Sequence, residues 1–255
     1  MKIRHIAAGL CVLSCSAVTS ADVLALLAQQ AEEDAAAPPT EVEAPGPWYV
    51  AAAVGGTFAL DADAKENNAR FRFKGGVGVN VGVGYAFAED WAVELHSGLL
   101  WNEIDSVGGS VTSRLGNDFN LGGGTGHMYQ VPVMGSIVYS IHFTEKLALG
   151  LKAGAGIQWT DMDVKNIRAF GPLAPMNTFG YSKQSTAFRW EVGVRVANQI
   201  APNIRIGGGV MFSGTSEVNI GSPNYAGGPA FLPAGDTKLD AIYNISLGFG
   251  INITF

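Results

Sequence analysis

Apolar and polar residues alternate strictly along the last eleven residues of the chain. The apolar members occupy every second position up to the final residue: Ile245, Leu247, Phe249, Ile251, Ile253 and Phe255. The residues between them are Ser, Gly, Asn and Thr. A period of two predicts a β-strand with one wholly apolar face and one small or polar face.

The same alternation recurs in segments 76–87, 91–101, 147–159 and 188–196. In these segments the charged residues, such as Glu94 and Lys152, always fall on the face that is rich in glycine. If that face met lipid, each Arg or Lys near the middle of the membrane would cost about 2–4 kcal/mol. The apolar face is therefore expected to face lipid and the charged face to line a narrow interior.

Segments 48–58, 128–143 and 204–216 complete a set of eight candidate strands. Three-residue turns at 88–90, 144–146 and 201–203 alternate with long connections at 59–70, 105–126, 160–185 and 217–237. Short periplasmic turns and long external loops are typical of outer-membrane barrels. The predicted fold is all-β, an eight-stranded antiparallel up-and-down transmembrane β-barrel with four extracellular loops.

The amino-terminal part of the chain predicts export. Residues 1–21 have a basic start, an apolar run and small residues before a cleavage point, which is the pattern of a signal peptide. Residues 22–46 are acidic and rich in Ala and Pro, and we expect a solvated periplasmic linker there. The barrel is assigned to residues 47–255. Both cysteines, Cys11 and Cys15, lie within the signal, and lipidation of Cys15 is the alternative reading of this region.

Composition excludes several other classes. A chain starting at Asp22 has 14 basic and 22 acidic residues, a net charge of −8, which does not suggest nucleic-acid binding. No histidine pair has metal-ligand spacing, so no metal or cofactor is expected. His96 and Ser97 are adjacent and point to opposite faces of a strand, which argues against direct pairing of their side chains in catalysis. His127, near a predicted loop, leaves a lipid A modifying enzyme as a minor alternative.

The predicted interior carries a cluster of charged residues. Charges facing one another inside a narrow barrel should pair, because an unpaired buried charge is costly. The residues expected in this network are Lys74, Glu94, His96, Lys152, Arg189, Glu191, Arg195 and Arg205. The network reads as a structural plug of ion pairs, because eight strands enclose a space that side chains can fill. A gated passage with a basic excess is the alternative.

Aromatic residues stand at the ends of the predicted strands. Trp and Tyr concentrate at membrane–water interfaces. The residues expected in the two interfacial girdles are Trp48, Tyr85, Trp91, Trp101, Trp159 and Trp190.

Three short stretches give the chain a resemblance to a known family. Trp48-Tyr49-Val50, Val131-Pro132-Val133 and the final run 248–255 resemble the porin-like, opacity-type outer-membrane β-barrels, whose architecture is shared with the small OmpA and OmpX barrels. The resemblance implies an outer-membrane location and contact with its lipids. It also implies the barrel-assembly machinery as a partner, which would read the final strand through Phe249, Ile251, Ile253 and Phe255.

The leading functional hypothesis is a non-enzymatic barrel that serves envelope structure and surface contact through its external loops. A narrow small-solute porin with a basic lumen is the second hypothesis, and a lipid A modifying enzyme is the third. The sequence does not identify a ligand for the loops.

Overall fold

A computed structural model describes residues 46–65, 68–112, 118–171, 177–225 and 236–255. The predicted signal peptide and most of the predicted linker lie outside these residues. Among the described residues, no helix has the length and apolarity needed to cross a membrane. Residues 44–255 form one compact unit, which is described below.

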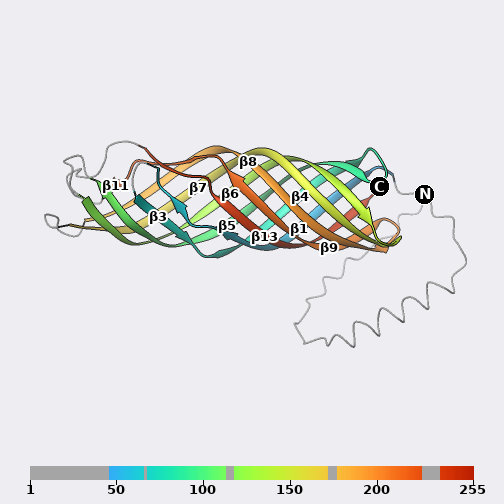
Figure 1. Ribbon diagram of the computed structural model, residues 1–255, viewed down its shortest axis with the longest axis horizontal. Helices are drawn as coiled ribbons and strands as arrows, with labels where there is room; N and C mark the ends of the chain where they lie inside the picture. The colour runs from blue at the N-terminus through green and yellow to red at the C-terminus, as the bar shows by residue number, and fades with distance from the viewer. Residues whose placement is uncertain (1–45, 66–67, 113–117, 172–176, 226–235) are drawn as a thin grey trace, which may run out of the picture. The chain divides into compact units, whose positions relative to one another are not determined.

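Eight strands close into a ring, as the alternation predicted. In order around the ring they are β1 (Trp48–Ala59), β4 (Gly75–Ala86), β5 (Trp91–Thr112), β6 (Asp118–His142), β7 (Leu147–Phe170), β8 (Asn177–Ala201), β9 (Ile204–Thr215) and β13 (Tyr243–Thr254). Every neighbouring pair is antiparallel, and β13 pairs with β1 to close the sheet. Among the described residues, closure gives each of the eight ring strands a partner on both sides, which is what a sheet surrounded by lipid requires. Figure 1 shows the strands winding at a tilt around a long barrel.

The predicted short turns are confirmed. Residues 88–90 join β4 to β5, the turn at 143–146 joins β6 to β7, and Pro202 with Asn203 joins β8 to β9. All three lie at one end of the barrel, which is the periplasmic end in outer-membrane barrels. The carboxyl terminus lies at the same end (Figure 1).

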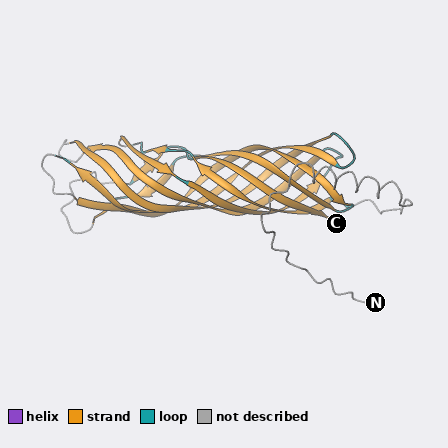
Figure 2. Cartoon of the chain, turned by 90° about the horizontal axis from the view of Figure 1, so that it is seen from below, coloured by secondary structure: helices purple, strands orange, loops and turns teal. Residues whose placement is uncertain are grey.

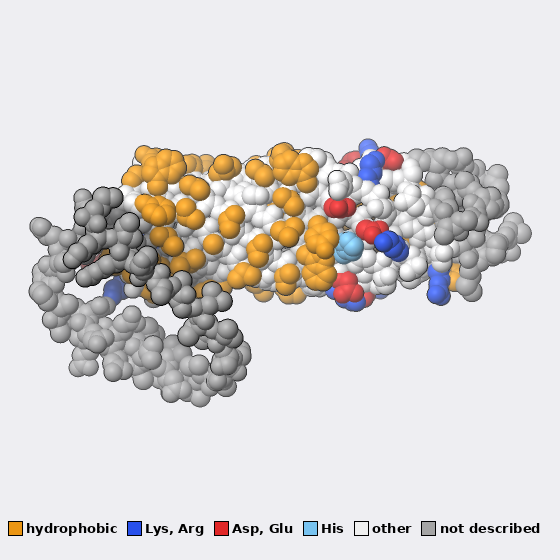
Figure 3. Space-filling view, turned by 180° about the vertical axis from the view of Figure 1, so that it is seen from behind, with side chains coloured by type: hydrophobic (Ala, Val, Ile, Leu, Met, Phe, Trp, Pro, Cys, Tyr) orange, Lys and Arg blue, Asp and Glu red, His pale blue; other side chains and the backbone are white. Residues whose placement is uncertain are grey.

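The outward face near this end is apolar. Val50, Val81, Leu95 and Leu247 are among many large apolar side chains that are 40–65% exposed. On the face that Figure 3 shows, apolar side chains spread over the half of the barrel toward the turn end, and charged side chains gather beyond them. A band of this kind would be unfavourable in water, and it fits the lipid-facing surface of a membrane barrel.

The connections predicted as long loops are mostly strand. Strands β5 to β8 continue well beyond the apolar band and are 22–25 residues long, whereas a membrane-spanning strand needs about 9–11. The expectation of loops across 105–126 and 160–185 was therefore wrong for most of their length. Strand pairing continues there because the inward side chains become apolar and bury one another. Figure 2 shows these strands running through the outer half of the barrel.

Short strands complete this outer extension. They are β2 (Ala62–Asp63), β3 (Asn68–Phe73), β10 (Val218–Gly221), β11 (Asn224–Tyr225) and β12 (Thr237–Leu239). β3 pairs with the outer part of β5, β11 pairs with β8, and β10 pairs with β12. The predicted connections 59–70 and 217–237 thus also contain strand.

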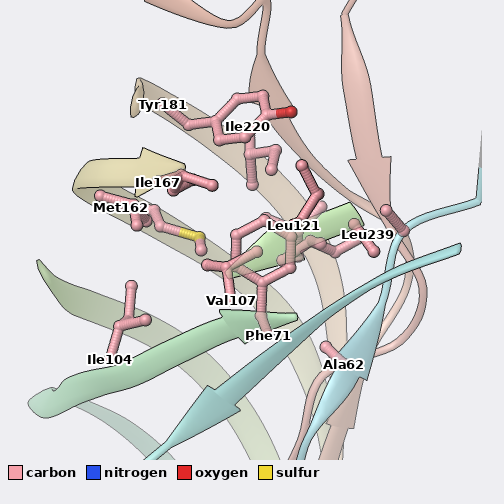
Figure 4. Packing of buried hydrophobic residues seen from close by; sticks show 14 of the residues in the cluster. Ala62, Phe71, Ile104, Val107, Leu121, Met162, Ile167, Tyr181, Ile220 and Leu239 are labelled. Atoms are coloured by element: carbon pink, nitrogen blue, oxygen red, sulfur yellow. The ribbon is translucent and has the colours of Figure 1, made fainter. Parts of the chain in front are cut away.

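A cluster of buried apolar side chains fills the interior of the extension. Phe71, Ile104, Met128, Ile167 and Leu239 are fully buried within it. Figure 4 shows side chains from different strands pointing toward one another across the barrel axis. The outer half of the barrel therefore has a packed hydrophobic core, while the half inside the apolar band has a polar interior.

Candidate functional site in the barrel interior

Lys152 is the centre of a buried ion-pair cluster in the membrane-spanning half. It lies on the inward face of β7, where Gly150, Gly154 and Gly156 leave room around its long side chain. Its Nζ lies 2.9 Å from Glu94 Oε2 and 3.4 Å from Glu191 Oε1. One ammonium group therefore holds two carboxylates, from β5 and β8, that would otherwise repel each other.

Glu94 has further partners across the lumen. Arg195 donates to its Oε1 at 2.9 Å, and the Tyr49 hydroxyl donates to the same oxygen at 2.9 Å. The Tyr49 ring fits only because residue 84 on the neighbouring strand is glycine, where a Cβ would lie 2.1 Å from the ring. Sequence reasoning did not assign Tyr49 to the network, although its inward position in the alternation of β1 is a usable signal.

Glu191 is held by neutral and polar groups as well as by Lys152. The Ser136 hydroxyl donates to its Oε1 at 3.2 Å. His96 Nε2 lies 3.1 Å from the same oxygen, but the ring N–H is poorly aligned with it. His96 Nδ1 lies 3.2 Å from Lys152 Nζ, which has only hydrogens to offer, so this ring nitrogen is the acceptor.

Arg189 lies deeper in the barrel and is bonded to neutral groups. Its side chain donates to Gln158 Oε1 and, at 2.7 Å, to Ser213 Oγ. The residue is 3% exposed, and its Nε has no hydrogen-bond partner. Among the described residues, no carboxylate forms an ion pair with it. Arg189 is thus in the interior, as predicted, but outside the ion-pair cluster.

Two other residues of the predicted network lie elsewhere. Lys74 is not in the interior, which corrects the prediction: its side chain is 50% exposed and lies 2.7 Å from Glu103 and 3.5 Å from Asp105 on the outer surface. The prediction failed because Lys74 lies between β3 and β4, where the alternation is interrupted. Arg205 faces the interior near the turn end and makes no ion pair with any described residue.

A cavity of about 210 Å³ runs beside the cluster. One wall consists of small inward residues of β1, β9 and β13, including Ala53, Gly207 and Gly250. The opposite wall carries the cluster and Arg189. A second cavity of about 200 Å³ at the turn end shares Arg195, Arg205 and Asn252 with the first. The hollow part of the interior therefore faces the periplasmic end.

The outer surface of the extension carries a collar of ion pairs. Arg70 donates to Asp63 at 2.6 Å and 3.0 Å, Lys183 pairs with Asp236, and Lys65 pairs with Glu217. The hydrogen bond from Arg70 holds the pKa of Asp63 below its usual value. The Lys183 ammonium, with the Asn219 amide and Ser222 hydroxyl, lowers the pKa of Asp236 to about 2. These groups are exposed, so each pair contributes little stability.

The aromatic residues proposed for the girdles lie on the outward face. Trp48 packs against Tyr85 with ring centroids 4.8 Å apart, close to the turn end, and Trp91 packs against Tyr139 at the same distance. Trp101, Trp159 and Trp190 lie roughly one membrane-spanning length of strand away from that end, about 9–11 residues. This spacing supports two interfacial belts, which stay a proposal.

The final strand shows its apolar face to the outside. Phe249 is 59% exposed, Ile251 37% and Phe255 68%, and Ile253 is half-buried. The Phe255 amide donates to the Trp48 carbonyl at 2.9 Å, so the end of β13 stays paired with β1. The face that the assembly machinery is expected to read is therefore accessible.

Among the described residues, the side chains of Ser97 and His127 have partners other than His96. The Ser97 hydroxyl donates to the Pro132 carbonyl at 2.8 Å, whereas His96 points into the lumen. His127 lies on β6, between Glu103 of β5 and Asp163 of β7, and its ring packs against Tyr129. No group of three His, Cys, Asp or Glu side chains that could hold a metal is found among the described residues.

Known proteins resemble this chain only distantly. No curated protein sequence matches the chain. Among solved structures, Neisserial surface protein A (NspA) shares 13% identity over 84% of this chain and 100% of its own, with a TM-score of 0.43. OprG from Pseudomonas aeruginosa shares 16% over 82% and 97%, with a TM-score of 0.44. The protease OmpT from Escherichia coli shares 10% over 85% and 100%, with a TM-score of 0.35.

The family assignment rests on the sequence itself. The family described as "Outer membrane protein beta-barrel domain" matches residues 21–252, which is most of the chain. The closed ring of eight strands and the outward apolar band are the features that such a domain requires. The chain therefore belongs to the outer-membrane β-barrel domain family, and its location is the outer membrane.

Proposed function

We propose that this protein is a non-enzymatic outer-membrane barrel that strengthens the envelope and carries a rigid contact surface above the membrane. The observation that supports this most directly is the packed extension. Strands β5 to β8 continue outward, and their interior is filled by the apolar cluster around Phe71 and Met128. A packed core makes the extension a solid support for whatever its outer end contacts.

The same core argues against the alternative of a small-solute porin. Phe71, Ile104 and Met162 are at most 1% exposed, and they pack across the barrel axis (Figure 4). An apolar interior that is this closely packed holds no chain of water molecules through which an ion could pass. The basic lumen of the membrane-spanning half would then end below the extension instead of opening outside.

The interior chemistry also favours a structural role over an enzymatic one. Glu94 and Glu191 are fully engaged by Lys152, Arg195, Tyr49 and neighbouring polar groups. They face the lumen beneath the apolar core and not the lipid around the barrel. His127 is on the outward face, and no described side chain is bonded to it as a catalytic partner.

Conductance in planar bilayers tests the structural reading. The purified full-length protein should give no steady single-channel openings. Steady openings that are abolished by Arg189→Gln or Arg195→Gln would instead establish the porin. Both variants must show the gel mobility of a folded barrel before their records are compared.

Surface contact is tested on cells. Bacteria that express the protein should attach to a host-cell or glycan surface more than cells without it. Replacement of segment 226–235 by a short Gly-Ser connection is the matched variant, because it leaves the ring of eight strands unchanged. Equal attachment by all three strains on every surface tried would contradict the contact role.

Mass spectrometry of lipid A from the same cells tests the alternative of a lipid A modifying enzyme, and unchanged lipid A is expected.

A further inference from the structure

The charges inside the membrane-spanning half do not balance. Among the described residues, the interior holds the cations Lys152, Arg189, Arg195 and Arg205 but only two carboxylates, Glu94 and Glu191. Lys152 and Arg195 lie within 2.9 Å of Glu94, and Lys152 also reaches Glu191. The two paired cations therefore neutralise the two carboxylates. Arg189 and Arg205 remain as the excess in this part of the interior, and at the turn end Arg205 shares the second cavity with Glu89 and Asp90.

Of these two cations, Arg189 has the greater need of a bonded counter-charge, because it is almost completely buried. Its partners Gln158 and Ser213 are neutral, and its Nε has no hydrogen-bond partner among the described residues. A buried charge without a counter-charge is costly in a protein interior. Glu191, two residues along the same strand, attracts Arg189 electrostatically but forms no ion pair with it, since its direct contacts are Lys152, His96 and Ser136.

A second polar side chain without partners lies close by. Asn244 of β13 is directly opposite Ser213 of β9 in the strand register, and Ser213 is bonded to Arg189. Asn244 is fully buried, and neither polar atom of its side-chain amide has a hydrogen-bond partner in the part of the chain that the structure describes. The end of the lumen nearest the apolar core therefore holds two N–H groups with unused hydrogen-bonding capacity. One belongs to the Arg189 guanidinium and the other to the Asn244 amide, one strand pair away.

The interior cavity connects this end with the rest of the lumen. It is lined by Arg205 at one end and by Arg189 and Thr57 at the other, and it passes along the glycine and alanine wall beside the ion-pair cluster. Arg205 also lines the cavity at the turn end. A small solute from the periplasmic side would therefore meet Arg205 first, then Arg195, and then Arg189. Outward, the apolar core closes the way.

We propose that the barrel binds a small monovalent inorganic anion, of the size of chloride, at Arg189. The site lies at the end of the interior cavity nearest the apolar core. The anion lies beside the Arg189 guanidinium, which lines the cavity, and supplies the negative charge that no bonded partner of Arg189 provides. The unpartnered Nε–H is buried, so the side chain shifts when this group donates to the anion. It enters from the periplasmic end along the glycine and alanine wall, and Arg205 attracts it at the start of that path. This site does not depend on the contact role proposed above, because it lies in the membrane-spanning half.

Chloride binding is measured on the full-length protein folded in detergent. The protein is kept in sodium gluconate, whose anion is much larger than chloride, and chloride is added at constant ionic strength. The ³⁵Cl resonance should broaden in proportion to folded protein, and the temperature of unfolding should rise with chloride. Arg189→Gln should weaken the chloride affinity by at least about tenfold, because it removes a hydrogen bond to a charged group.

Arg72→Gln is the matched control, because Arg72 is an exposed arginine of the outer extension, 4.0 Å from Asp61. It should bind chloride as the wild type does. If Arg189→Gln does not fold, Arg189→Lys keeps the charge and should retain chloride binding, and folding of each variant is checked by gel mobility without heating. Broadening no greater with folded wild type than with boiled protein would overturn the proposal. Equal broadening with wild type and a folded Arg189→Gln would overturn it too.

Discussion

Removing one charged side chain from the interior leaves its partners as unpaired buried charges. Lys152 has a side chain 9% exposed and contacts both Glu94 and Glu191. The two carboxylates have other donors, but only Lys152 reaches both of them among the described residues. The stability of the barrel therefore depends more on the Lys152 ammonium group than on any ion pair of the outer surface.

Lys152→Met should lower the free energy of unfolding by about 3–5 kcal/mol, because removing one member of a buried pair leaves buried charge uncompensated. Urea titrations of the protein folded in lipid vesicles, followed by tryptophan fluorescence, measure this. Lys165→Met is the matched control, since Lys165 lies 2.8 Å from Asp163 with its side chain 71% exposed. The control should change the free energy by less than about 1 kcal/mol. Equal effects of the two substitutions would show that the lumen pairs contribute no more than surface pairs.

Asp236 provides a test of the collar through its pKa, which Lys183 and two polar neighbours lower to about 2. Because the folded pKa lies below the unfolded one of about 3.9, the contribution of this group to stability is present above pH 4. It is lost as the pH falls from about 4 toward 2. Lys183→Met should return the pKa of Asp236 toward its usual value, as measured by ¹³C NMR of labelled carboxyl groups. A pKa unchanged by the substitution would show that Lys183 is not the cause.

At the scale of a strand, the face that carries the apolar residues changes along its length. On β5, the outward residues Leu95 and Leu99 are apolar in the membrane-spanning part, whereas the inward residues Ile104 and Val111 are the apolar ones beyond it. The switch occurs because lipid surrounds the first part and water surrounds the second. A strand can therefore remain continuous while its apolar face moves from outside to inside.

Two arginine substitutions on β5 test this switch. Leu95→Arg places a charge on the lipid-facing side, 65% exposed in the absence of lipid, and should cost about 2–4 kcal/mol of folding free energy in a bilayer. Gly108→Arg lies on the outer part of the same strand, where a Cβ would meet nothing within 4 Å, and should cost less than about 0.5 kcal/mol. Folding in vesicles at graded urea concentrations measures both. A cost at Gly108 as large as that at Leu95 would contradict the position of the membrane boundary.

At the scale of the whole molecule, closure of β13 on β1 decides whether the barrel is stable in detergent. Because every ring strand is paired, the unheated protein should resist detergent and migrate faster on a gel than the boiled protein. Identical migration of the two samples would contradict a closed barrel.

Assembly into the outer membrane is expected to depend on the final strand, whereas folding in detergent is not. Phe255 is 68% exposed and makes one backbone hydrogen bond to Trp48. Phe255→Ala should therefore reduce the amount of protein in the outer membrane several-fold, because the assembly machinery is proposed to read this aromatic ring. The variant should still refold in detergent as the wild type does. Normal levels in the outer membrane would remove Phe255 from the assembly signal.

The sequence by itself determined the ring of eight strands, the three short turns and the lipid-facing side, because a period of two and the position of charges depend only on local order along the chain. It also placed Glu94, Lys152, Glu191 and Arg195 in one interior. Partners within that interior were decided by the tertiary structure, since the strand register brings Tyr49 to Glu94 from 45 residues away. The tertiary structure also decided that Lys74 lies outside and that the supposed loops are strands with a packed core. The exposure of Lys74 and the packed core both depend on whether lipid or water surrounds that part of the barrel. Only the closed fold fixes the height of each residue along the barrel axis.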